Sequence, residues 1–340
     1  MNGGGAVSDN GADWRRAVQP YIGPDARRAS FQVVTTLGAL ALGMWISHLV
    51  LAWSLPLALL LALPIAGLII RTFVLMHDCS HGSFFASRRA NDWVGFATGV
   101  VALTPFAQWR RDHAMHHASS GDLDRRGHGD FPTLTVREFR ARSWKARLGY
   151  RLIRHPLLLL LGGPIKLAIG QRLRGSATEP GSRQMYGVVA TNVLIVLSLA
   201  AGVWFAGWQT VLVAYVLPYY LAAMIGVWLF YVQHQFEDAY WAPHNDWDYV
   251  EAALRGSSHL KLPAVLNWFT GNIGLHHVHH VAPRIPNYRL RRCHEENELF
   301  HRSPTITLSS GISALRLSLW DEDLQRLVRF RDVDLATSRA

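Results

Sequence analysis

The chain has 340 residues, half of them hydrophobic, and carries a formal net charge of +10 at pH 7. Its basic residues accompany long apolar runs and no recognition motif, which argues against nucleic-acid binding. The charge fits cytosolic segments beside anionic lipid headgroups, with an acidic redox partner as the alternative. Cys79 and Cys293 fall in regions predicted to be cytosolic, where thiols stay reduced, so they indicate no disulfide framework.

Two long stretches, 29–70 and 184–236, contain no Asp, Glu, Lys or Arg. A membrane-spanning helix needs about 20 apolar residues, so each stretch is long enough for two spans. Residues 54–56 and 206–209 divide the stretches as the turns of helical hairpins would. The sequence therefore predicts spans near 31–53, 56–76, 187–206 and 210–232, with Pro218 as a site for a kink in the last.

Basic residues precede the first span and crowd the segment between the two hairpins, while the hairpin turns carry none. The positive-inside rule therefore places both termini and that segment in the cytosol. Two shorter apolar runs, 93–109 and 156–170, are predicted to be interfacial, because a span at 93–109 would separate the first two histidine groups. After residue 304 the chain is polar, and we predict amphipathic helices around 312–320 and 321–330.

These features predict an all-α integral membrane protein with two helical hairpins and a cytosolic helical cap. We divide it into a polar N-terminal segment, which lacks a signal-peptide hydrophobic region, a membrane domain and a cytosolic C-terminal tail. Their predicted bounds are 1–30, 31–302 and 303–340.

Three histidine groups lie near the predicted cytosolic ends of the apolar regions. Histidines three and four residues apart share one face of a helix, and neutral imidazole is the commonest protein ligand for metals and suits iron. A lone HxxxH pattern is weak, but two HxxHH triplets in one chain are improbable by chance. The predicted metal ligands in the three groups are His77 and His81, then His113, His116 and His117, then His276, His279 and His280.

His234, at the end of the fourth predicted span, is either an interfacial histidine or a ninth ligand, and we favour the ligand. Glu237 and Asp238 behind it are either acceptors for ring N–H groups or solvated surface charges. His277 points away from the face of His276 and His280. His48 lies inside the first predicted span, far from its cytosolic end. The remaining histidines lack the spacing and are predicted to be surface or interfacial residues: His128, His155, His244, His259, His294 and His301.

Eight or nine histidines are more ligands than one metal ion can bind, so the simplest interpretation is that two ions are bound by these histidines. Zinc with water would imply hydrolysis, and iron with dioxygen would imply C–H oxidation. The spacing alone does not separate these two.

Longer stretches around the histidines carry a family resemblance. They are 77–85 (HDCSHGSFF), 109–113 (WRRDH), 232–238 (VQHQFED), 240–241 (YW), 269–274 (FTGNIG) and 283–288 (PRIPNY). These stretches, in this order around two hairpins, resemble those of the membrane fatty acid desaturases. Their finer sequence resembles the acyl-lipid branch related to delta-12 (omega-6) desaturases. The resemblance covers roughly residues 60–330. Ser80 stands where this branch often has Gly.

The resemblance implies a histidine-ligated centre of two irons, which uses dioxygen and two electrons to remove two hydrogens from adjacent methylenes of an acyl chain. No His-Pro-Gly-Gly haem motif occurs, so electrons would come from a separate protein, by analogy ferredoxin. The expected substrate is a monounsaturated acyl lipid, and the expected location is the bacterial inner membrane with the site facing the cytosol. Aromatic residues that flank two boxes are candidates for lining the acyl chain: Phe106, Trp109, Trp268 and Phe269.

Two other classes stay open. A lipid or carotenoid hydroxylase or ketolase shares similar histidine boxes, although the stretches 233–241 and 285–288 favour a desaturase. A transporter or metal-binding scaffold would need polar residues along the spans, which are nearly free of them.

Overall fold

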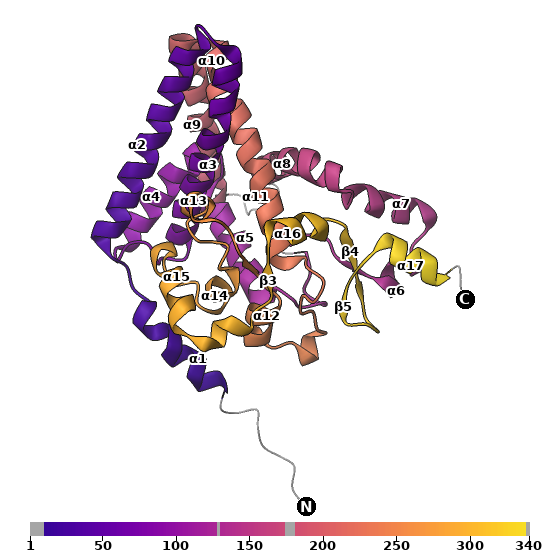
Figure 1. Cartoon of the computed structure of the whole chain (residues 1–340). Coiled ribbons are helices and arrows are strands. Elements are labelled where there is room, and N and C mark those ends of the chain that lie inside the picture. Colours follow the sequence, from indigo (N-terminus) through magenta and orange to yellow (C-terminus); the bar gives the residue numbers. More distant parts are fainter. Residues whose placement is uncertain (1–9, 128–129, 174–180, 338–340) are drawn as a thin grey trace, which may run out of the picture.

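The computed structural model describes residues 10–127, 130–173 and 181–337. Long apolar helices rise together as a column from a broader body of short helices (Figure 1). Among the described residues, four helices are long and apolar enough to cross a membrane, in two consecutive pairs. This confirms the predicted fold class. The helices are α2 (Ala26–Leu51), α3 (Leu55–Ser80), α9 (Arg183–Ala206) and the continuous run Trp208–His234, which comprises α10 (Trp208–Val211), a π-helical turn (Leu212–Val216) and α11 (Leu217–His234).

Local signals set the ends of these helices. Asp25 accepts hydrogen bonds from the backbone N–H groups of Arg27 and Arg28 at the start of α2, and Ser54 caps α3 in the same way. Gly207, with φ of 83°, separates α9 from α10. The π-helical turn lies immediately before Pro218, where the missing N–H of proline disturbs the helical hydrogen bonds.

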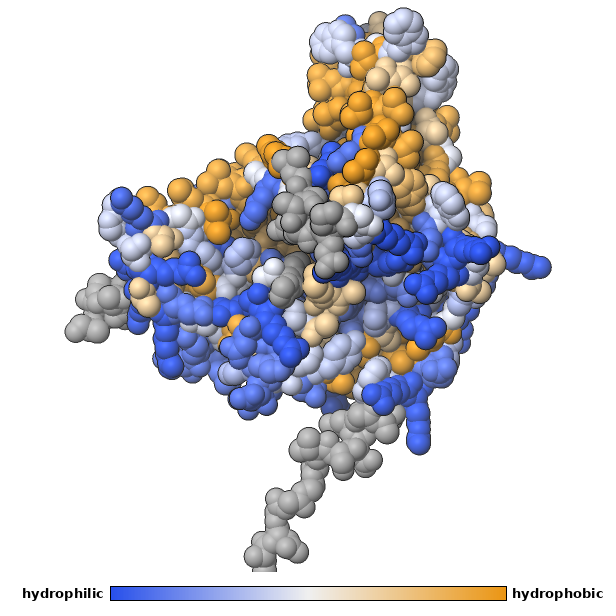
Figure 2. All heavy atoms as spheres, turned by 180° about the vertical axis from the view of Figure 1, so that it is seen from behind, coloured by the Kyte–Doolittle hydropathy of each residue, from blue (hydrophilic) through white to orange (hydrophobic). Residues whose placement is uncertain are grey.

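The second span, α3, runs through the centre of the bundle. Sixty-one per cent of its most apolar window is buried, against 17–22 % in the other three candidate spans. Those three present apolar side chains outward, and the column is hydrophobic on its surface while hydrophilic residues gather around its foot (Figure 2). The column therefore has the surface of a membrane-embedded unit.

The two shorter apolar runs form helices at the foot of the column. The run 93–109 is divided between α4 (Arg88–Val101) and α5 (Phe106–Ser119), with a break at Leu103, whose φ is 52°. The run 156–170 forms α8 (Pro156–Leu173), which follows α7 (Trp144–Ile153) at a bend of 78°. Taken together, α7 and α8 have the length and composition of a bent span.

The remaining described elements complete the body below the column. Two strands join distant segments: β2 (His259–Leu260) pairs in parallel with β3 (Thr305–Ile306). The helices and 3₁₀ turns of this body are α1 (Asn10–Val18), Gln19–Tyr21, α6 (Val136–Ala141), His244–Asp246, α12 (Tyr249–Arg255), α13 (Ala264–Phe269), α14 (His276–Val281), α15 (Asn287–Glu296), Glu298–Arg302, α16 (Leu308–Ala314) and α17 (Phe330–Thr337).

The prediction of amphipathic helices at 312–320 and 321–330 was wrong. After α16 the chain forms β4 (Leu317–Asp321) and β5 (Arg326–Arg329), an antiparallel pair with β1 (Leu134–Thr135) added in parallel to β4. Asp321 accepts hydrogen bonds from the N–H groups of Asp323 and Leu324, which builds the turn. The buried apolar run 317–320 thus pairs as a strand. The domain bounds at 30 and 302 stay a prediction.

Candidate metal centre

The structure brings all nine predicted histidines together from four helices. Two come from the C-terminal end of α3, where His81 is the residue directly after the helix, three from α5, one from the last position of α11 and three from α14. Because α3 and α11 continue beyond the predicted spans, the helices themselves carry His77 and His234 to the foot of the column.

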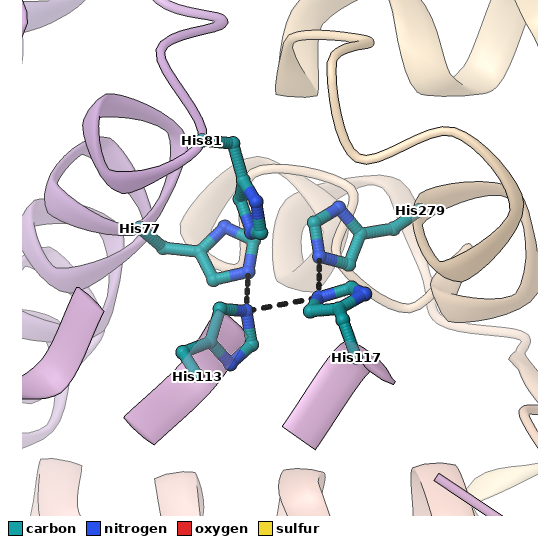
Figure 3. A group of neighbouring side chains, drawn as sticks. All are labelled: His77, His81, His113, His117 and His279. Atoms are coloured by element: carbon teal, nitrogen blue, oxygen red, sulfur yellow. Dashed lines mark hydrogen bonds between the residues drawn. The ribbon is translucent and has the colours of Figure 1, made fainter. Parts of the chain in front are cut away.

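The nine side chains divide into two neighbouring groups. In each group, one ring nitrogen per histidine lies within 4.8 Å of the others. Helices α5 and α14 contribute to both groups, and the rings of His117 and His280, which belong to different groups, stack 4.2 Å apart. We call the first the five-histidine group, His77, His81, His113, His117 and His279 (Figure 3), and the second the four-histidine group, His116, His234, His276 and His280.

The ring nitrogens of each group converge at short, regular distances. In the five-histidine group, Nε2 of His113 lies 3.0 Å from that of His77 and 3.1 Å from that of His117, which is 3.0 Å from Nε2 of His279. In the four-histidine group, the corresponding Nε2–Nε2 distances are 3.2, 2.9 and 3.1 Å.

These distances fit nitrogen ligands around metal ions. Metal–imidazole bonds of about 2.1 Å place neighbouring ligand nitrogens about 3.0 Å apart at right angles, and about 3.4 Å apart in a tetrahedron. Five histidines in one group also exceed the four ligands of a closed structural zinc site. The donor set therefore fits an ion with five or six ligands better than structural zinc, and imidazole is compatible with iron.

Burial favours the neutral form that binds metals. Loss of solvation, followed by repulsion from neighbouring histidines, holds the pKa of His113, His117 and His279 well below its usual value. Nε2 of His81 is buried without a hydrogen-bond partner in the described chain. A cation between the five rings would give this nitrogen a partner, since neutral imidazole is a ligand and burial without a partner is unfavourable.

Carboxylates and a carbonyl orient several of these rings from behind. Nδ1 of His116 lies 2.5 Å from Oδ1 of Asp130, and Nδ1 of His77 lies 3.3 Å from Oδ1 of Asp78. Nδ1 of His234 lies 3.2 Å from the carbonyl oxygen of Gly256. An acceptor at Nδ1 leaves Nε2 as the free ligand atom and makes it more basic.

Sequence reasoning did not find these partners. Asp130 follows His116 by 14 residues in a loop, a separation that carries no periodic signal. Asp78 lies in the sequence between two predicted ligands, but no role was predicted for it. Its Oδ2 accepts hydrogen bonds from the backbone N–H of Asn287 at 2.7 Å and from the side-chain amide of Asn287 at 2.8 Å, and these bonds connect α3 to α15. Glu237 and Asp238 are exposed, and Glu237 pairs with Arg326, as expected for the surface-charge alternative.

His277 lies outside both groups, as its position on the helix predicted. It is fully buried, and its Nε2 lies 3.1 Å from Nδ1 of His294. Of the other histidines, His48 bonds to Thr210 and His244 to Asp122. His128 lies outside the described residues.

The four aromatic candidates for substrate contact occupy different places. Trp109 stacks on His113, with ring centroids 4.2 Å apart. Phe106 is buried in the cluster that also holds Met76, and Phe269 packs against Gly67 of α3. Trp268 is half exposed beneath the guanidinium of Arg71. Trp109 is the candidate whose ring meets the histidines directly.

Comparison with known proteins agrees with this site. Residues 51–306 match the family described as fatty acid desaturase. A fatty acid desaturase of Bacillus subtilis (strain 168) is 41 % identical over 321 residues, which cover 94 % of this chain and 90 % of that protein. Two Synechocystis proteins are more distant. An sn-1 acyl-lipid omega-3 desaturase (ferredoxin) is 30 % identical, over 66 % of this chain and 62 % of that protein. An sn-1 oleoyl-lipid 12-desaturase is 26 % identical, over 79 % of this chain and 75 % of that protein.

The matched region contains both histidine groups and the spans from α3 onward. The resemblance to the delta-12 branch, which the sequence motifs suggested, is only distant at 26 % identity. The chain therefore belongs to the membrane fatty acid desaturase family and is an integral membrane oxidoreductase.

Proposed function

We propose that this protein introduces a double bond into the acyl chain of a membrane lipid at a centre of two irons held by its nine clustered histidines. The observation that carries this proposal is the pair of adjacent histidine groups at the foot of the apolar column. Bound iron would supply, with dioxygen and two electrons, the oxidation of unactivated methylenes, for which side chains offer no acid–base route. The expected reaction removes two hydrogens from adjacent carbons.

The chain's own residues position and shield this centre. Five histidines would hold one ion and four the other, and Asp78, Asp130 and the Gly256 carbonyl would keep the rings in place through Nδ1. The ring of Trp109 covers His113 and excludes water from one side of the five-histidine group. An acyl chain that reaches the site from the bilayer would have to be held so that a chosen pair of carbons meets the metals.

Three finer points belong to this proposal. The substrate is a monounsaturated acyl lipid converted in the delta-12 (omega-6) manner, for which the sequence motifs and the distant 12-desaturase are the support. The electron donor is a separate ferredoxin, and the support is that the omega-3 relative from Synechocystis is named as a ferredoxin desaturase. The site faces the cytosol of a bacterial inner membrane, supported by the arginine-rich segments beside it.

The test is expression in a bacterial host together with a ferredoxin reducing system, followed by mass spectrometry of fatty acid methyl esters. New dienoic acids should appear only with oxygen and should be absent from the His279→Ala variant. A new monounsaturated acid would keep the desaturase but correct its regiochemistry. A hydroxylated or keto product without a new double bond would assign the protein to the hydroxylases or ketolases instead.

A further inference from the structure

An open cleft of about 390 Å³ lies beside the five-histidine group. Its walls come from the end of α3, the loop that follows it, the start of α4 and one residue of α5. His81 belongs to both the wall of this cleft and the five-histidine group, so the cleft adjoins the metal centre. The lining residues include Ala86, Arg88, Asp92 and Arg110.

The charges around the cleft are mainly positive. Asp92 accepts hydrogen bonds from Arg110 at 2.7 Å and from Arg183 of α9 at 2.8 Å, so one carboxylate stands against two guanidinium groups. Burial opposes ionisation of Asp92, but these two arginines outweigh it and hold its pKa below its usual range. Arg88 is exposed on the wall and makes no ion pair among the described residues. An anionic ligand would find in Arg88 a cation that no carboxylate in the described part of the chain neutralises.

The position of the cleft relative to the spans restricts the ligand further. It opens where the apolar helix α3 ends, and the neighbouring α4 exposes Trp93, a residue type that gathers at membrane–water interfaces. Hydrophilic residues surround the foot of the apolar column (Figure 2). An acyl chain lying in the membrane beside the histidines has a carrier group that must remain in polar surroundings.

We propose that this cleft binds the phosphate of the group that carries the acyl chain, with Arg88 as its main contact. This inference rests on the proposed function, and it narrows the substrate to acyl chains on a phosphate-bearing carrier. A phospholipid and an acyl-coenzyme A share this chemistry, whereas an uncharged glycolipid does not. Guanidinium groups bind phosphate through paired, charge-assisted hydrogen bonds.

The first experiment is equilibrium binding by native mass spectrometry, using the full chain both with and without iron. The probes are dioleoyl-phosphatidylglycerol, oleoyl-coenzyme A and dioleoyl-monogalactosyl-glycerol. Arg88→Gln should weaken binding of at least one phosphate probe about tenfold, the loss expected for one charge-assisted contact. Arg89→Gln removes the same charge from an exposed neighbour that does not line the cleft, and it should leave binding unchanged.

A second pair of variants tests the cleft itself. Ala86 lines the wall and is exposed, so Ala86→Glu should repel the phosphate, whereas Ala86→Gln has almost the same size without the charge. We expect only the glutamate variant to weaken binding. The phosphate probe that loses affinity identifies the carrier as phospholipid or coenzyme A.

Equal behaviour of Arg88→Gln and Arg89→Gln, or tightest binding of the galactolipid, would overturn the inference. Because binding is measured without turnover, its outcome is independent of the reaction. If the phosphate probe binds and this binding depends on Arg88, but the protein forms no new double bond, the result would support this site and contradict the proposed function.

Discussion

At the scale of single residues, His280 and His277 separate a ligand from a structural histidine on the same helix. His280 belongs to the four-histidine group, while His277 is buried against His294 and lies outside both groups. His280→Ala should lose bound iron. His277→Ala should keep iron but lower the free energy of unfolding by about 1–3 kcal/mol, because it leaves a cavity and an unpaired partner. Iron per chain by mass spectrometry, together with thermal unfolding, measures both. Equal loss of iron in the two variants would contradict the assignment.

Asp130 offers a second test at this scale, because its carboxylate lies behind His116 rather than in the metal groups. Its Oδ1 is 2.5 Å from Nδ1 of that ring. Removing such a partner commonly weakens metal affinity about 10–100-fold, so Asp130→Ala should release iron to a chelator at correspondingly lower concentration. Glu237→Gln is the matched control, since Glu237 is exposed and pairs with Arg326. Chelator titrations that coincide for the parent protein and Asp130→Ala would rule out this role.

At the scale of elements, Arg154 fastens the C-terminal hairpin to the span that carries His234. This side chain is 1 % exposed, follows α7 and donates hydrogen bonds to Tyr231 Oη at 3.0 Å, Gln235 Oε1 at 2.8 Å and the Leu317 carbonyl at 3.0 Å. Arg154→Met removes one hydrogen-bond donor from each of these three buried oxygens. It should cost about 1.5–3 kcal/mol and expose the segment 317–329 to limited proteolysis.

Arg147 supplies the control for that prediction. It lies on the exposed side of α7, and Arg147→Met should leave both the melting temperature and the cleavage pattern unchanged. Cleavage that is the same in both variants would show that the hairpin is held by other contacts.

The histidine helices could be predicted because their signals are local. Unbroken apolar length marks the spans, and spacings of three and four residues mark the faces of α5 and α14. The hairpin β4–β5 could not be predicted in this way, because the strand Leu317–Asp321 is completed by β1, more than 180 residues earlier. Asp130 was missed for the same reason. Its contact depends on how a loop closes over α5, which no spacing in the sequence records.

At the scale of the whole molecule, both histidine groups lie at one end of the apolar column, and the turn between α9 and α10 lies at the other (Figure 1). The basic segments around α6 and α7 share the end with the histidines. The positive-inside rule predicts that this end faces the cytosol and that Trp208, at the turn, faces the opposite side. An active site on the cytosolic side is where a cytosolic electron donor could reach it.

Thiol labelling can test this orientation directly. The two native cysteines, Cys79 and Cys293, are buried, so a membrane-impermeant maleimide should report mainly on introduced cysteines. Trp208→Cys, at a position that is 60 % exposed, should react in intact cells. Lys145→Cys, on the exposed part of α7, should react only after the membrane is opened. The parent chain measures background labelling. Labelling of Lys145→Cys in intact cells, with protection of Trp208→Cys, would invert the topology and place the histidine groups outside the cytosol.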